Sequence, residues 1–413
     1  MTTPQPQSFA ALRHKGFRTF LTYSAMTMMA DSIEHVISYW IIFQKFESPA
    51  LGGFAILSHW LPMLMFGVSV GGLADRFDPR RLIQIGLCCF MTASLAWSLL
   101  FLTDSLQMWH AAVILTVHGM GSLFWNLPSQ VLIHDIVGPQ QLPSAVRLYA
   151  TSRYLGLLAG PAVGGGILLA FGPSHGLLFN ILIYLPLLFW LWKAPYGPLF
   201  RAGAPAMKRA VRGFADIVQT IRDVSGNRVV TSMILLASCY SLFVGNAYQA
   251  QMPEFARDLG HGDPGPLYSM LLAADAAGAF LAGVLLETRG LLQPKPRTAC
   301  ILAMLWCCAI GGFAMVGAYP AALLLLFFAG FLELSFSSMA QTLVQLRAPP
   351  EIRGRVIGLY GMGALGFRAF SGVSVGVMGA MLGIHWSLAL SAAVLFAIVT
   401  GLLAYSGRPS PTA

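Results

Sequence analysis

The chain has 413 residues, of which 56% are hydrophobic and only 10% are charged. A soluble domain carries about 25% charged residues, so this composition excludes an ordinary soluble protein and indicates a membrane protein. The formal net charge of +9 would suit a nucleic-acid partner, but the placement of the basic residues along the chain excludes that interpretation.

Apolar stretches of about 20 residues recur along the chain and predict membrane-spanning helices. Twelve spans are expected, at approximately 19–44, 51–74, 82–103, 108–131, 146–171, 176–194, 229–249, 267–287, 298–318, 320–345, 356–382 and 385–406. A long polar segment separates the first six spans from the last six. We therefore expect an all-α membrane protein with an N-terminal six-helix bundle (1–194), a cytoplasmic central linker (195–228) and a C-terminal six-helix bundle (229–413).

Basic residues are concentrated in alternate loops. The loops on the same side as the N-terminus hold nearly all the Lys and Arg, whereas the opposite loops hold only Lys45 and Arg257. This asymmetry follows the positive-inside rule and predicts that both termini and the central linker are cytoplasmic. We expect a multi-pass membrane protein, whose positive charge sets its topology rather than binding nucleic acid.

The first predicted span carries Asp31, Glu34 and His35 within apolar sequence. On a helix these residues share one face with Ser24, Thr27 and Ser38, which together form a continuous polar stripe. A charged side chain inside the membrane costs about 2.5–3.5 kcal/mol, so such residues face a bundle interior or cavity. The stripe therefore predicts a cavity lining that handles protons, with Ser38 as a substrate-contact candidate.

The segment GGLADRFDPRR follows span 2 and resembles the loop signature of the major facilitator superfamily. It departs from the signature at Asp78 and Pro79. The resemblance implies a twelve-helix transporter in which this loop holds the cytoplasmic side closed. Glycine permits close approach of a neighbouring helix, an acid can face a helix N-terminus, and arginines can pair between the halves. The gate residues implied are Gly71, Asp75, Arg76, Arg80 and Arg81; for Arg80 and Arg81, plain topological anchors are the alternative.

Span 5 contains RYLGLLAGPAVGGG, which resembles the antiporter signature of exporter branches of this superfamily. Small residues allow close helix packing, and a proline bends the helix. The residues concerned are Gly156, Gly160, Pro161, Gly164 and Gly165, although Arg147 stands where the signature has an earlier glycine. The resemblance implies a tight, leak-resistant contact; generic small-residue packing is the alternative.

Span 4 lacks the arginine that proton-coupled exporters of this superfamily often carry, because Leu115 occupies that position. His118 follows nearby and is a second candidate for proton exchange, with a structural, hydrogen-bonded histidine as the alternative. Arg153 is expected at mid-depth in span 5, beside span 1. We expect it to pair with Asp31 or Glu34, leaving the other carboxylate and His35 to exchange protons; a static buried ion pair is the alternative.

The two halves show a weak internal repeat. VGPQQLPSAVRLY before span 5 resembles APPEIRGRVIGLY before span 11, and GGLAD resembles GVLLE (283–287). This pattern predicts two pseudo-symmetric bundles with the transport site between them, near the middle of the membrane. In the second half, Asp275, Glu333 and Arg368 are candidates for coupling, with Arg368 expected to pair with one of the two acids. The remaining substrate-contact candidates are Trp125, Asn126, Tyr240, Asn246, Tyr248, Gln249, Ser337 and Gln341.

The sequence has no phosphate-binding loop, dinucleotide fingerprint or metal-ligand spacing, so we expect neither an enzyme, a cofactor nor a metal site. Its overall pattern, including LVQLRAPPEIRGRVIGLY, resembles the bacterial branch of enterobactin exporters and macrolide-efflux proteins. The resemblance implies proton-coupled efflux of a small molecule such as a drug, siderophore or other metabolite across the bacterial inner membrane. We expect the protein to act as a monomer in the lipid bilayer. An importer or lysophospholipid-type flippase of this fold, or a non-transporting membrane scaffold, is the alternative.

Overall fold

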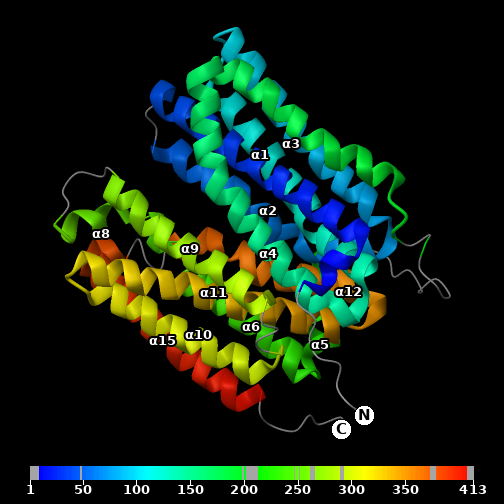
Figure 1. Ribbon diagram of the computed structural model, residues 1–413, viewed down its shortest axis with the longest axis vertical. Helices are drawn as coiled ribbons and strands as arrows, with labels where there is room; N and C mark the ends of the chain where they lie inside the picture. Colours follow the sequence, from blue (N-terminus) through cyan, green and yellow to red (C-terminus); the bar gives the residue numbers. More distant parts are fainter. Residues whose placement is uncertain are drawn as a thin grey trace.

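The computed structural model describes residues 9–46, 49–197, 200, 213–245, 247–250, 252–260, 266–288, 293–372 and 378–406. Within these ranges all regular secondary structure is helical. Figure 1 shows two groups of helices side by side, one from the N-terminal part of the chain and one from the C-terminal part. Each group has its own apolar core.

The N-terminal group begins with a short 3-10 helix, η1 (Ala10–Arg13), and continues with α1 (Lys15–Phe46), α2 (Pro49–Arg76), α3 (Pro79–Leu102) and α4 (Met108–Lys193). Backbone turns interrupt α4 at Gly138, with φ 70°, and at Gly172, with φ 73°. Side chains disfavour such positive φ values, and glycine adopts them readily. These two turns divide α4 into three helical segments, in the region where spans 4, 5 and 6 were predicted.

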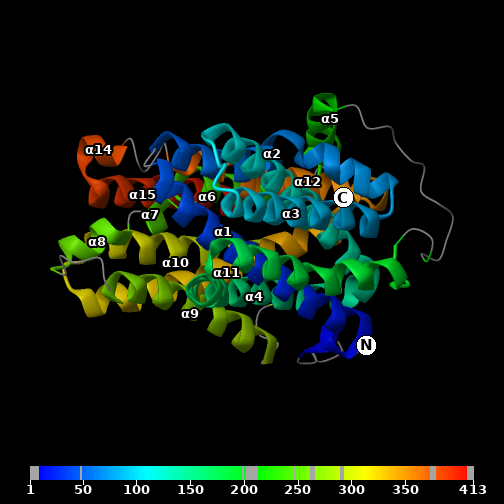
Figure 2. The same ribbon diagram turned by 90° about the horizontal axis from the view of Figure 1, so that it is seen from above.

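A helix also forms inside the predicted polar linker. This helix, α5 (Phe214–Ser225), contacts α2, α6 (Arg228–Phe243) and α12 (Arg353–Gly361). Asp216, Thr220 and Val224 recur every fourth residue and are buried, so one face of α5 packs on the bundle. Figure 2 shows α5 standing beside α12.

The C-terminal group continues after α6 with short and long helices. They are α7 (Ala247–Ala250), α8 (Met252–Asp258), α9 (Pro266–Thr288), α10 (Pro296–Met315), α11 (Tyr319–Arg347), η3 (Pro350–Ile352), α12, η4 (Met362–Gly366), α13 (Arg368–Gly372), α14 (Met378–Leu382) and α15 (Ile384–Ser406). The element η4 is a π-helical turn between α12 and α13. Such turns occur frequently at functional sites.

Seven helical segments among the described residues are long and apolar enough to cross a membrane. They are Leu57–Arg76, Pro79–Leu102, Val163–Lys193, Met270–Thr288, Pro296–Met315, Tyr319–Arg347 and Ile384–Ser406. The helix α6 is apolar but shorter. The helix α1 does not belong to this set, and it is the helix that carries Asp31 and Glu34. The chain is therefore a multi-pass membrane protein whose ionisable residues are concentrated in particular helices.

Glycines bring α2 and α12 into backbone contact between the two groups. A Cβ atom added to Gly71 would lie 2.0 Å from the Gly354 carbonyl oxygen, and one added to Gly358 would lie 2.2 Å from the Gly67 carbonyl oxygen. Real Cβ atoms do not approach so closely, so larger residues would force these helices apart. This contact sets the distance between the groups at one end of the molecule.

Candidate functional site

The first candidate site is a buried ionisable cluster between α1 and the first segment of α4. His118 lies between two carboxylates: its Nε2 is 2.8 Å from Asp31 Oδ1, and its Nδ1 is 2.8 Å from Glu34 Oε1. All three residues are buried. Ser94 of α3 donates to the second oxygen of Glu34 at 2.5 Å. We call Asp31, Glu34 and His118 the carboxylate–histidine cluster.

The cluster must hold a proton beyond the one that a neutral imidazole carries. Two hydrogen bonds join one ring to two carboxylates, and each bond needs its own proton. A neutral imidazole has only one N–H. The second proton therefore resides on the other ring nitrogen or on one of the carboxyl groups. The cluster is therefore a buried group that binds this additional proton.

Two more histidines extend the cluster. His35 Nδ1 lies 3.6 Å from Asp31 Oδ2, and the His35 ring is 4.7 Å from the His118 ring and 5.0 Å from the His59 ring. Possible ligand atoms of the three histidines lie within 4.8 Å of one another, so they are the side chains here that could hold a metal. His118 would first have to release a carboxylate, because both of its nitrogens are engaged.

The expected ion pair between Arg153 and Asp31 or Glu34 is absent from the described part of the chain. His118 satisfies both carboxylates instead, because the first segment of α4 places its ring between them. His59 was not among the predicted site residues, although it is an ionisable residue inside a predicted apolar span.

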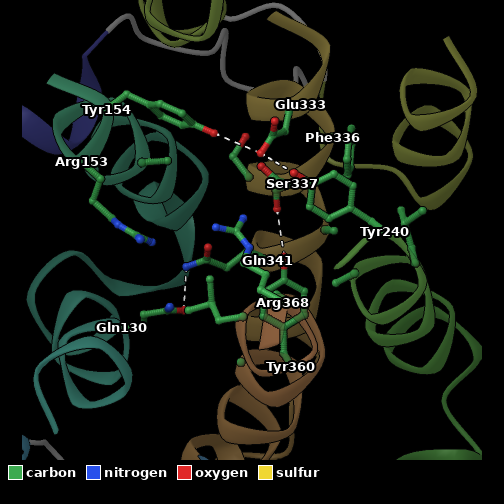
Figure 3. Close-up of a pocket in the computed structure, with 18 of the residues that line it drawn as sticks. Gln130, Arg153, Tyr154, Tyr240, Glu333, Phe336, Ser337, Gln341, Tyr360 and Arg368 are labelled. Atoms are coloured by element: carbon green, nitrogen blue, oxygen red, sulfur yellow. Dashed lines mark hydrogen bonds between the residues drawn. The ribbon is translucent and has the colours of Figure 1, made fainter. Parts of the chain in front are cut away.

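The second candidate site is a pocket of about 150 Å³ between the two groups of helices. Figure 3 shows that its walls come from α4 on one side and from α6, α11, α12 and α13 on the other. Its polar lining consists of Gln130, Arg153, Tyr154, Tyr240, Gln249, Glu333, Ser337, Ser338, Gln341, Tyr360 and Arg368. The pocket thus lies where the internal repeat predicts a transport site.

Hydrogen bonds cross the pocket from α4 to α11. The Tyr154 hydroxyl donates to Glu333 Oε1 at 3.3 Å, and Tyr240 of α6 donates to the same oxygen at 2.6 Å. Gln341 donates to Gln130 Oε1 at 2.6 Å. The Glu333 carboxylate is therefore held by one phenol from each group of helices (Figure 3).

Arg153 and Arg368 line the same pocket from opposite groups of helices. Neither forms a salt bridge within the described residues, and the Nε of each is buried without a hydrogen-bond partner there. The expected pairing of Arg368 with Asp275 or Glu333 is therefore not met. The Arg368 guanidinium instead lies 5.3 Å from the centroid of the Trp60 ring. Asp275 accepts from Tyr248 at 3.2 Å and from Gln249 at 3.1 Å.

The other substrate-contact candidates divide between the pocket and its surroundings. Tyr240, Gln249, Ser337 and Gln341 line the pocket. Ser38 donates to the Glu34 carbonyl within α1, and Asn126 accepts from Gln130 one helical turn away. Trp125 packs against Phe90, and Tyr248 contacts Asp275; neither lines the pocket. Asn246 lies outside the described residues.

The predicted gate motif lies at the contact between α2 and α12. Asp75 accepts hydrogen bonds from the backbone amides of Gly354, at 2.5 Å, and Arg355, at 3.0 Å. These amides belong to the N-terminus of α12, where a carboxylate is electrostatically favoured. Gly71 provides the close approach described above.

The arginines of that motif do not form the expected pairs between the halves within the described chain, but make other contacts. Arg80 pairs with Asp78 and donates to the Ala194 carbonyl, and Arg81 donates to Gln84 at 2.8 Å. Arg76 is exposed and lies near the Phe77 ring. The Arg80 guanidinium also lies 5.2 Å from the centroid of the Phe200 ring in the linker. Among the described residues, these arginines therefore do not pair between the halves.

A second contact between the groups joins α9 to α4. Arg147 pairs with Glu287 at 2.9 Å, and the Ser144 hydroxyl also donates to this carboxylate. The arginine that replaces a glycine of the antiporter signature thus has a partner in the other half of the chain.

The glycines of the antiporter-like motif press the second segment of α4 against α1. A Cβ added to Gly156 would lie 2.8 Å from Met28 Cβ, one added to Gly160 would lie 2.2 Å from Ser32 Cβ, and one added to Gly164 would lie 3.2 Å from Ile33 Cα. Gly165 would meet no described atom within 4 Å, and Pro161 lies in the same helical segment. Three of the four glycines therefore make the close contact.

Comparison with known proteins gives the chain a family. The model of a family described as transmembrane secretion effector matches residues 6–408. Macrolide efflux protein A of Streptococcus pyogenes is 22% identical over 84% of each chain. The enterobactin exporter EntS of Salmonella typhimurium is 25% identical over 77% of this chain and 75% of its own.

Solved structures share the fold. The fucose:proton symporter FucP of E. coli superposes with a TM-score of 0.72 at 10% identity, over 96% of this chain and all of its own. This similarity shows that the chain has the same twelve-helix fold. We conclude that the chain belongs to the transmembrane secretion effector family, a group of major facilitator superfamily transporters, and is not an enzyme.

Proposed function

We propose that this protein exports a small molecule across a bacterial inner membrane in exchange for protons, by alternating access. The observation that carries the proposal is the additional proton required by the carboxylate–histidine cluster. A buried proton-binding group beside a pocket between two helical groups is what a proton-driven exchanger needs. The efflux names of two relatives support the direction of transport, and the symporter fold supports coupling to protons.

The moving units in this proposal are the two bundles, residues 1–194 and 229–413, joined by the linker 195–228. Both termini and the linker lie in the cytoplasm, following the distribution of basic residues. The Asp75 and Glu287 contacts then close the cytoplasmic side. Opening that side requires both contacts to break.

The histidines connect the carboxylate–histidine cluster to the pocket through a series of packed rings. The His118 and His35 rings are in contact, His35 contacts His59, and the His59 ring lies 4.6 Å from the Trp60 ring. Trp60 in turn lies against Arg368 in the pocket. Loss of the additional proton removes one of the two hydrogen bonds between His118 and the carboxylates, which weakens the attachment of α1 to α4. The pocket and the proton site are thus joined by packed rings.

The transported compound would first be sought by measuring accumulation of a macrolide and of enterobactin in cells with and without the gene. Protein reconstituted in vesicles with a fixed pH gradient would then be tested with the compound that is exported. We expect Asp31→Asn, Glu34→Gln and His118→Gln to retain counterflow while losing proton-driven transport. Asp104→Asn is the matched control, because Asp104 is exposed and pairs with Lys45 at 2.6 Å. Normal proton-driven transport by all three cluster variants, with unchanged pH dependence, would refute the proposal.

A further inference from the structure

We propose that the pocket between the helical groups binds an organic anion, with Arg153 and Arg368 holding its carboxylate, sulfonate or phosphate group. This inference rests on the proposed transport function and names the chemical class of its substrate. The argument begins with the charges of the pocket. Its ionisable lining at neutral pH consists of Arg153, Arg368 and Glu333, which leaves an excess of positive charge.

The carboxylates near the pocket are already engaged by other donors. Tyr154 and Tyr240 donate to Glu333, and Tyr248 and Gln249 donate to Asp275. The carboxylates of the cluster face His118. No carboxylate among the described residues lies within salt-bridge distance of either pocket arginine. The two guanidinium groups are thus left without an anion from the described residues.

Three other arginines of the described chain, which are buried or partly buried, each pair with a carboxylate. Arg80 pairs with Asp78 at 2.5 Å, Arg147 with Glu287 at 2.9 Å, and Arg355 with Asp216 at 3.5 Å. Unpaired charge away from water is costly, and proteins normally neutralise it with a partner. Arg153 and Arg368 lack such a partner, and they are the arginines that line the pocket. A ligand anion supplies the missing charge.

The geometry favours an oxyanion. A guanidinium group presents planar N–H donors that match carboxylate, sulfonate and phosphate oxygens. Arg153 comes from α4 and Arg368 from α13, so one anion held by both would bridge the two helical groups. Figure 3 shows both side chains directed toward the pocket interior.

The remaining lining suits an apolar or aromatic body. It includes Phe336 and the rings of Tyr154, Tyr240 and Tyr360, together with Met28 and Leu236. Aromatic and aliphatic walls with a few converging polar groups are typical of sites for small molecules. The pocket therefore suits an amphiphilic anion, in which one end is charged and the other is aromatic or aliphatic.

The test measures binding of radiolabelled 1-naphthoate to the purified full-length protein in lipid nanodiscs. The competitors are unlabelled 1-naphthoate, the neutral 1-naphthamide and the cationic 1-naphthylmethylamine. We expect naphthoate to compete at least 10-fold better than either analogue. Each of Arg153→Gln and Arg368→Gln should weaken naphthoate binding by about 10- to 100-fold, as expected for loss of a charged hydrogen-bonding partner.

Three further variants separate charge from folding. Arg153→Lys and Arg368→Lys keep the positive charge and should retain more affinity than the Gln variants. Glu333→Gln removes the pocket's negative charge and should strengthen naphthoate binding. Arg257→Gln is the matched control, because this arginine is exposed on α8 and should leave binding unchanged. Each variant would be compared only after its helical content and elution volume match those of the parent.

Absence of naphthoate binding to the parent protein, equal competition by naphthamide, or unchanged binding in both Arg→Gln variants would overturn the inference. Preferential binding of naphthylmethylamine that is lost in Glu333→Gln would also overturn it and would identify a cation site. None of these outcomes requires transport or a pH gradient. Failure of the anion site is therefore distinguishable from failure of proton-coupled export, which the vesicle experiment measures separately.

Discussion

Asp75 at the end of α2 and Glu287 at the end of α9 occupy equivalent positions in the internal repeat, and each contacts a helical segment in the other half of the chain. Asp75 accepts from the backbone at the start of α12, and Glu287 accepts from Ser144 and pairs with Arg147 in α4. Each acid at the end of one helix thus holds the beginning of a helix in the other half. The pair gives the seam between the halves an approximate twofold symmetry.

The Asp75 contact should control opening at this end of the molecule. In Asp75→Asn, the side chain loses its charge toward the α12 N-terminus, and we expect the closed seam to lose about 1–2 kcal/mol. Hydrogen exchange of the first amides of α12, measured by mass spectrometry in nanodiscs, should become faster. Asp78→Asn is the control, because Asp78 pairs with Arg80 inside the N-terminal group. Equal protection of α12 in Asp75→Asn and the parent would contradict this role.

The pair of Arg147 with Glu287 should be strongly coupled, because the Glu287 side chain is only 1% exposed. Removing one partner leaves a buried charge, and either Arg147→Gln or Glu287→Gln alone should cost about 3–5 kcal/mol. The double variant should cost clearly less than the sum of the two. Unfolding of the four proteins in detergent would be compared as a double-mutant cycle. Additive effects would show that the contact carries no coupling energy.

Gly160 should be the least tolerant glycine of the antiporter-like motif. A Cβ there would lie 2.2 Å from Ser32 Cβ, so Gly160→Ala must push α4 away from α1 at a cost of about 1–3 kcal/mol. Gly165→Ala is the matched control, since no described atom lies within 4 Å of its added Cβ. Thermal unfolding of the detergent-solubilised proteins should separate the two variants. A similar melting temperature for both would contradict the described packing.

We expect the His59 side chain to take part in proton coupling, in addition to packing against its neighbours. His59→Phe keeps an aromatic ring against His35 and Trp60 but removes both nitrogens. We expect this variant to retain counterflow and to transport several-fold fewer protons for each substrate molecule in vesicles carrying a pH-sensitive dye. An unchanged proton-to-substrate ratio would show that only ring packing matters at this position.

The sequence predicted the fold well because its signals are local or repetitive. Span length and hydrophobicity reflect membrane thickness, and the two six-span halves follow from their order along the chain. The helix α5 was not predicted, because it lies in the polar linker. Its packed face is recognised only from the burial of Asp216, Thr220 and Val224 in the structure. Composition in that region gave no indication of a packed helix.

The partners within the site could not be predicted in the same way. Helical periodicity placed Asp31 and Glu34 on one face of span 1 but could not show which neighbour reaches that face. His118 and Arg153 lie on successive segments of α4, and only the turn at Gly138 decides which of them meets the carboxylates. Likewise, only the three-dimensional structure shows that no carboxylate of the described residues pairs with Arg153 or Arg368.

The two phenols on Glu333 make the pocket's electrostatics depend on how the halves are positioned. Tyr240 belongs to the same half as Glu333, whereas Tyr154 belongs to the other. Separation of α4 from α11 removes the Tyr154 hydroxyl and leaves the carboxylate with one phenol donor. The pocket then becomes less favourable to a negative charge, while Arg153 moves away with Tyr154. In the proposed transporter, separating α4 from α11 would thus also weaken the binding of an anion, so we expect anion release to accompany opening.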